Sequence, residues 1–85
     1  MAHKQPNLDQ KATNRVAAYT DLYVANRGFL PRLTTNRFET HLGWAVWSPS
    51  NPPGDTIAYF TTAEAAQKAI VTAWQRHPEI YRRSL

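Results

Sequence analysis

The sequence contains no cysteine. This absence excludes a disulfide framework, a thiolate zinc site and a thiol nucleophile, and secreted domains this small usually carry disulfides. The chain also lacks an apolar run near the roughly 20 residues that a membrane-spanning helix requires. Residues 1–6 lack the apolar run of a signal peptide. The sequence therefore predicts a cytoplasmic protein with no membrane partner.

Glycine is scarce, and the three glycines stand far apart rather than clustered as in a phosphate-binding loop. The histidines are equally scattered, at His3, His41 and His77. None of them has a second histidine or a carboxylate at the spacing of a helical metal site. We therefore predict neither a metal nor a cofactor.

A catalytic constellation is also missing. Glu39 and His41 stand two positions apart, so on a strand they would share a face and could orient a general base. No nucleophile or second acid can be placed beside them, which favours a solvated charged patch. Ser48 and Ser50 lie in a proline-rich segment without a partner base. The sequence thus predicts a protein that is not an enzyme and has no small-molecule substrate.

The chain does have a modest set of core-forming residues and an excess of basic over acidic residues. Its 85 residues suffice for a single domain, with residues 1–6 and 79–85 as tails. Ten basic residues against six acidic residues give a net charge of +4. A positive excess favours a polyanionic or acidic partner.

The first predicted helix runs from Leu8 to Asn26. Apolar residues recur there at steps of three and four, which places them on one helical face. They are Ala12, Val16, Tyr19 and Tyr23. Gly28 follows the last turn, where a left-handed C-cap favours glycine.

The central part of the sequence predicts strands. Pro31 allows only an edge strand over 29–33, and Thr34–Asn36 is typical of a turn. From Arg37 to Trp47 the pattern alternates, so Trp44 and Val46 point inward while Arg37 and Trp47 point outward. Gly43 suggests a bulge. The proline-rich segment 48–55 predicts a loop, and 56–60 a further strand.

A second helix follows, with Thr61 as its N-cap, Glu64 as the capping-box partner and Pro78 as its end. Its apolar stripe comprises Ala66, Ala69, Ile70, Ala73 and Trp74. The predicted fold is therefore α+β. It is a small antiparallel sheet of two to three strands, with an N-terminal and a C-terminal helix packed on one face. We expect Phe38, Leu42, Trp44, Val46, Ala66, Ile70, Ala73 and Trp74 to form the core with Val16 and Tyr19.

The stretch from Ile57 to Trp74 resembles small DNA-binding modules in which a three-stranded sheet packs on one helix. In those modules a strand ends in phenylalanine, a Thr or Ser caps the helix, and an acidic residue followed by alanines comes next. Here the matching residues are Phe60, Thr61–Thr62 and Glu64–Ala66. The similar families are the ethylene-response-factor type domain and the arm-binding domain of tyrosine integrases. The resemblance implies that the exposed sheet face would contact DNA.

Two basic and aromatic groups are candidate binding sites. One is the outward sheet face, with Arg32, Arg37, His41 and Trp47, and the other is the C-terminal Tyr81, Arg82 and Arg83. Arginines can hold phosphates, and aromatic rings can stack on bases. We therefore predict a non-catalytic binding module for nucleic acid. The alternative partner is an acidic protein or nucleoprotein complex. The chain would then be a small inhibitor or adaptor, of the anti-CRISPR-like kind that phages and plasmids encode against host defences.

Overall fold

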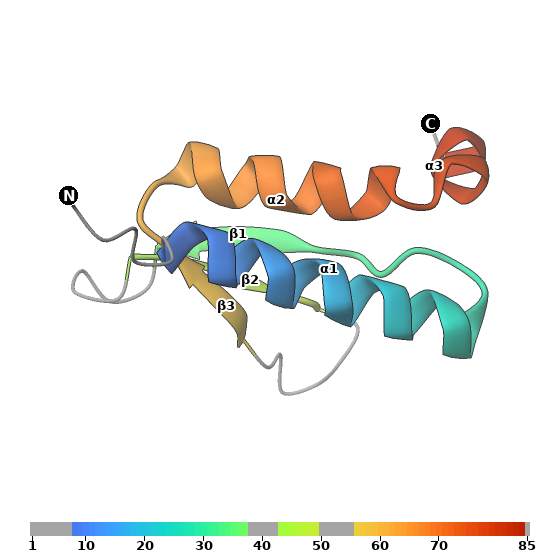
Figure 1. Ribbon diagram of the computed structural model, residues 1–85, viewed down its shortest axis with the longest axis horizontal. Coiled ribbons are helices and arrows are strands. Elements are labelled where there is room, and N and C mark those ends of the chain that lie inside the picture. Colours follow the sequence, from blue (N-terminus) through green and yellow to red (C-terminus); the bar gives the residue numbers. More distant parts are fainter. Residues whose placement is uncertain (1–7, 38–42, 50–55, 85) are drawn as a thin grey trace, which may run out of the picture.

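The computed structural model describes residues 8–37, 43–49 and 56–84. The elements follow in the order α1 (Leu8–Arg27), β1 (Thr34–Arg37), β2 (Trp44–Trp47), β3 (Thr56–Phe60), α2 (Ala63–Gln75) and α3 (Pro78–Ser84). The strands form an antiparallel sheet in the order β1-β2-β3. Helix α2 contacts all three strands, and α1 lies beside α2 and β3 (Figure 1). The fold is α+β, as the sequence predicts.

Helix α1 ends one residue later than predicted, at Arg27. Gly28 follows with a φ of 79°, and its N–H donates to the carbonyl oxygen of Val24 over 2.8 Å. Both observations confirm the predicted left-handed cap, which satisfies one of the carbonyl groups left open at the end of a helix.

The strand boundaries differ from the prediction. Thr34–Arg37 forms β1 rather than a turn, and 29–33 leads into it without being a strand. Arg37 pairs with Trp44 across the ladder, so one continuous strand from Arg37 to Trp47 is wrong. Two antiparallel strands each keep the period-two pattern, so the alternation does not reveal the hairpin that interrupts it.

The irregularity in the sheet also lies elsewhere than predicted. The register between β2 and β3 shifts between Val46 and Trp47, whereas Gly43 directly precedes β2. Gly43 has a φ of 86°, and a Cβ placed there would lie 2.4 Å from the carbonyl oxygen of Phe60. Glycine is required at this position because β3 passes close to it.

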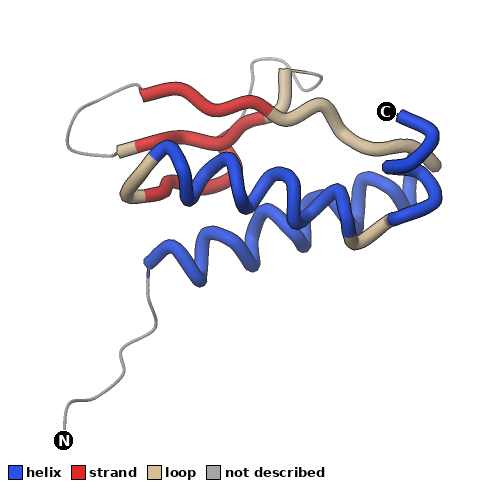
Figure 2. Tube along the Cα trace, turned by 90° about the horizontal axis from the view of Figure 1, so that it is seen from above, coloured by secondary structure: helices blue, strands red, loops and turns tan. Residues whose placement is uncertain are grey.

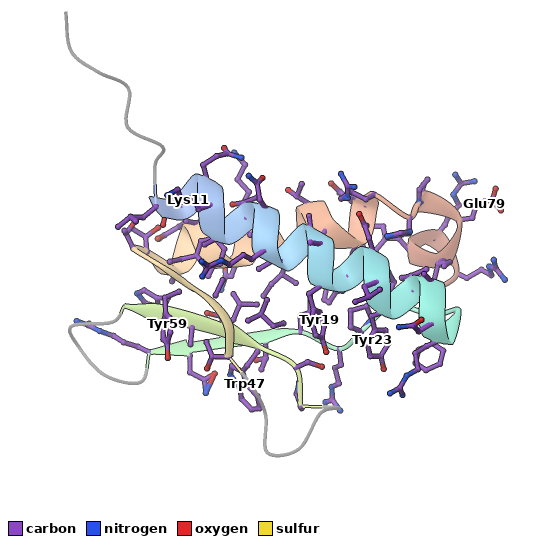
Figure 3. The ribbon with its side chains drawn as sticks, turned by 60° about the horizontal axis from the view of Figure 1, so that its bottom comes forward. Lys11, Tyr19, Tyr23, Trp47, Tyr59 and Glu79 are labelled. Atoms are coloured by element: carbon purple, nitrogen blue, oxygen red, sulfur yellow. The ribbon has the colours of Figure 1, made fainter. Side chains whose placement is uncertain are left out.

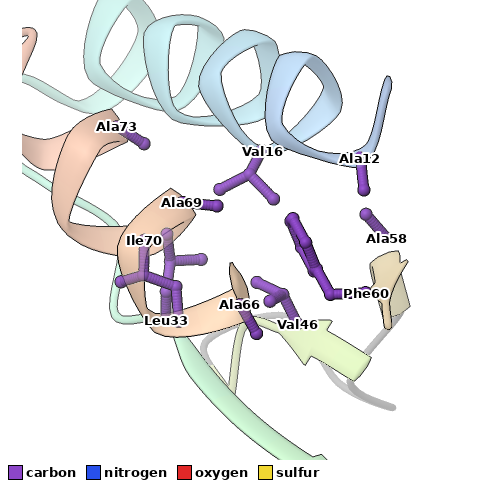
Figure 4. Close-up of a cluster of buried hydrophobic side chains, with 10 residues drawn as sticks. All are labelled: Ala12, Val16, Leu33, Val46, Ala58, Phe60, Ala66, Ala69, Ile70 and Ala73. Carbon is purple, nitrogen blue, oxygen red and sulfur yellow. The ribbon is translucent and has the colours of Figure 1, made fainter. Parts of the chain in front are cut away.

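The core lies between the sheet and the two long helices (Figure 4). Phe60 and Val46 enter it from the sheet, Val16 comes from α1, and all three are at most 2% exposed. The alanines of α2 bring that helix close to the strands. Five predicted core residues are confirmed as buried: Val16, Val46, Ala66, Ile70 and Ala73. Tyr19, Trp44 and Trp74 are only partly buried at its edge, and Phe38 and Leu42 lie outside the described residues.

The N-cap of α2 is Thr62 rather than Thr61. The side-chain oxygen of Thr62 accepts a hydrogen bond of 3.1 Å from the N–H of Ala65. Thr61 instead donates twice to Asp9, from its N–H to Oδ1 over 2.8 Å and from its hydroxyl to Oδ2 over 2.7 Å. These bonds join the first turn of α1 to the turn between β3 and α2.

The segment predicted as a C-terminal tail forms the short helix α3. Helix α2 stops at Gln75, and Pro78 occupies the first position of α3, where the missing N–H of proline costs nothing. The N–H of Tyr81 donates to the carbonyl of His77 over 2.9 Å. No residue of Pro78–Ser84 is fully buried, so α3 rests on the fold by partial contacts.

Asp21 joins the last half of α1 to the end of α2. The Arg76 guanidinium donates to both carboxylate oxygens, over 3.2 and 2.6 Å. His77 Nε2 lies 2.7 Å from Oδ1 and must carry the proton, because a carboxylate can only accept. The Arg76 hydrogen bonds hold the pKa of Asp21 below its ordinary value, partial burial opposes this, and the His77 bond adds to the lowering.

We expect Asp21→Asn to lower the melting temperature slightly at neutral pH, by less than about 5 °C, because both partners are partly exposed. The folded-state pKa lies below the ordinary value of 3.8, so the carboxylate stabilises the fold above that value. That contribution is lost as the pH falls through the folded-state pKa. Thermal melts of both proteins across the acid range should therefore converge. A gap that widens toward low pH would contradict the assignment.

Candidate functional site

The predicted site residues fall into two groups that lie apart. Arg37 ends β1, at the opposite end of the molecule from α3 (Figure 1). Its cross-strand partner Trp44 places it on the helix-facing side, whereas Trp47 points to the other face (Figure 3). The prediction that Arg37 and Trp47 share one surface is therefore wrong, because the hairpin changes the phase between them. His41 lies outside the described residues.

Trp47 is held against its own sheet. It is partly buried, and its Nε1–H donates to Oδ1 of Asn36 over 2.9 Å. Ala45 on the same face is fully buried, and its partner Tyr59 is 40% exposed. Among the described residues of this face, Tyr59 rather than Trp47 offers an exposed ring. Within the described strands this face therefore carries two aromatic rings but not the predicted Arg37.

The other predicted residues converge at the opposite end of the fold. Arg32 lies in the loop between α1 and β1, and Tyr81 lies on α3, which runs beside that loop (Figure 2). Together they line a groove of about 340 Å³. We call it the C-terminal groove; its lining residues are Leu30, Pro31, Arg32, Trp74, Tyr81 and Ser84.

Trp74 links the groove to the core. Its indole is partly buried and packs against the core, while its Nε1–H donates to the carbonyl of Pro31 over 3.0 Å. The Tyr81 ring lies nearly parallel to it, with ring centroids 6.3 Å apart and planes tilted by 28°. The sequence predicted a purely core role for Trp74, and the structure corrects that to a residue that also lines a groove.

Helix α3 also carries two basic side chains outside the C-terminal groove. Arg82 and Arg83 are exposed on another side of α3, where they line a second hollow with Glu79. Within the described residues the ion pair is that of Asp21 with Arg76, and His77 adds a hydrogen bond to the same carboxylate. Arg32, Arg82 and Arg83 therefore have no carboxylate partner among those residues.

A second surface was not predicted from the sequence. At the end of α1, Tyr23 meets Phe29 edge-on at 5.6 Å, and Arg27 lies 5.2 Å from the Tyr23 ring centroid. Leu22 and Phe29 are 65% and 52% exposed. We call Leu22, Tyr23, Arg27 and Phe29 the α1-end patch. The sequence contains a partial signal for this patch, because Leu22 is an apolar residue that flanks the predicted helical stripe and Phe29 is an apolar residue just beyond the predicted helix.

Other site types find little support in residues 8–37, 43–49 and 56–84. Within these ranges no three His, Asp or Glu side chains gather closely enough to hold a metal ion. No helix there combines the length and the apolar character needed to cross a membrane. What these residues do provide is a groove lined by two aromatic side chains, Trp74 and Tyr81, and by Arg32.

The groove could not be found by sequence spacing alone. Trp74 and Tyr81 are seven positions apart in two different helices, and Arg32 joins them from the loop after α1. Only the packing of that loop against α3 brings the three together. No family model matches this chain, and neither does any curated protein or solved structure.

Proposed function

We propose that this protein is a non-catalytic binding module that holds nucleic acid at the C-terminal groove. The observation that carries the proposal is the convergence of Arg32, Trp74 and Tyr81 on one groove of about 340 Å³. Arginines bind phosphate oxygens, and aromatic rings stack on bases. A groove that combines both suits a ligand that is itself both anionic and aromatic.

The charge distribution supports this ligand. Arg82 and Arg83 add positive charge on another side of α3, and the chain carries a net charge of +4. Glu79 is the acidic residue in the same hollow, so the arginines outnumber it there. A polyanion that crosses α3 would release counterions at several arginines, which gives affinity without sequence selection.

We expect Arg32→Ala to weaken the binding of DNA oligonucleotides and to lower the slope of log affinity against log salt. The slope should fall by about 0.7 to 0.9 units for each phosphate that the variant no longer neutralises. A double variant, Arg82→Ala with Arg83→Ala, should lower the slope further if both arginines meet the strand. A salt titration of fluorescence anisotropy measures these slopes.

Arg37→Ala is the matched control, because Arg37 is also an exposed arginine and ends β1, far from α3 (Figure 1). It should leave the slope nearly unchanged. A decrease with Arg37→Ala as large as that with Arg32→Ala would move the site to the sheet. Absence of binding to every oligonucleotide at low salt would rule out the proposed function.

The α1-end patch favours a second candidate, a protein partner. Leu22 and Phe29 expose most of their apolar surface beside Arg27, which suits an apolar segment carrying acidic residues. Such binding would depend weakly on salt and would make the chain an inhibitor or adaptor of a larger complex. The salt titration separates the two candidates, because only the nucleic-acid function predicts a steep slope.

A further inference from the structure

We infer that the ligand of the C-terminal groove is single-stranded, with one base seated between Arg32 and Tyr81 against Trp74. This inference rests on the nucleic-acid function proposed above and narrows it. The groove of about 340 Å³ would hold the base, and Arg32 in its lining would bind a neighbouring phosphate. Arg82 and Arg83, in the separate hollow on α3, would bind phosphates further along the strand.

The depth of Trp74 argues for a single strand. Its indole is partly buried, so a ligand ring reaches it only by entering the groove. In a duplex each base is stacked and paired, and taking one out requires both interactions to be broken. Bases of a single strand can be splayed out without breaking a base pair. The groove therefore selects against duplexes by its shape.

The rings argue for stacking rather than reading of base edges. Trp74 and Tyr81 are tilted by only 28°, so a base that is parallel to one ring is nearly parallel to the other. The indole has one donor, and it is already used on the carbonyl of Pro31. Recognition at Trp74 is then through the ring surface, which every base satisfies, so binding should tolerate most sequences.

Positive side chains lie both in the groove and on a separate surface of α3. Arg32 lies on the loop side, while Arg82 and Arg83 project from another side of α3. A strand with one base inserted can place phosphates on both sides of that base. Two contributions to the binding affinity can therefore be measured separately: base stacking at Tyr81 and phosphate binding at the arginines.

The test compares three probes by anisotropy and competition: a single-stranded oligodeoxyadenylate, the same strand in a duplex, and inorganic polyphosphate. We expect the single strand to bind at least about tenfold more tightly than the duplex. Tyr81→Leu should weaken single-strand binding by at least about fivefold, as the removal of one stacking partner does, and leave polyphosphate binding unchanged. Tyr81→Phe keeps the ring and should stay within about twofold of wild type.

The outcomes distinguish the two proposals. Equal binding of single strand and duplex, or an equal effect of Tyr81→Leu on polyphosphate, overturns base insertion and leaves nucleic-acid binding intact. Failure of all three probes to bind overturns both proposals. A matching oligoriboadenylate decides the source of the strand, since tighter binding of it indicates RNA and weaker binding indicates DNA. Thermal melts of both Tyr81 variants establish that they are folded.

Discussion

Gly43→Ala should destabilise the protein by about 3 kcal/mol or more. The φ of 86° costs an L-residue roughly 1–2 kcal/mol. The new Cβ would also lie 2.4 Å from the carbonyl oxygen of Phe60. That oxygen belongs to the backbone of β3, so relief requires the strand to move, and overpacking of this kind costs a further 1–3 kcal/mol or so. Urea unfolding measures the change in stability.

Gly28→Ala is the matched control. Gly28 has a similar φ of 79°, but a Cβ there would meet nothing within 4 Å. It should therefore show the conformational cost alone, roughly 1–2 kcal/mol. Equal destabilisation in the two variants would mean that β3 does not approach Gly43 as closely as the structure places it.

Phe60→Ala should cost roughly 3–5 kcal/mol, as truncation of a buried phenylalanine does. Phe60 is 2% exposed and is the largest of the fully buried side chains. Figure 4 shows its ring among residues from both long helices and from β2. Its removal would leave a cavity that the alanines of α2 are too short to fill. For a domain of this size that is a large share of the total stability, so unfolding in urea should begin at much lower concentration.

Tyr59→Ala provides the comparison within the same strand. Tyr59 precedes Phe60, points to the opposite face and is 40% exposed. Its truncation should cost about 1 kcal/mol or less, mainly through the weaker strand preference of alanine. A larger effect of Tyr59→Ala than of Phe60→Ala would reverse the assignment of the two sheet faces.

The elements set by local sequence were predictable. Helix α1 was found almost to the residue, because its apolar spacing and Gly28 both act within one or two turns. The sequence could not decide whether Thr61 or Thr62 is the N-cap of α2, since both side chains suit that role. Asp9, from the first turn of α1, takes both donors of Thr61 and leaves Thr62 to cap α2.

The strands and the site depended on longer-range packing. Period-two alternation continued across positions 37 to 47 and hid a hairpin, which reversed the face assigned to Arg37. Arg32 and Tyr81 were named as candidates, but on different surfaces. The short helix α3 brings them together, and its seven residues carry too weak a local pattern to be recognised as a helix.

Because α3 buries little surface, it can unfold locally while the rest of the fold stays intact. None of its residues is fully buried, and its ring contact with the core is that of Tyr81 on Trp74. Elements with so little buried surface open locally at free energies far below that of global unfolding. Amide protons of α3 would then exchange with solvent before those of α2. A ligand bound at Tyr81 would suppress the local unfolding of α3. The observed affinity would then be weaker than the intrinsic affinity, because binding must also order the helix that carries Tyr81.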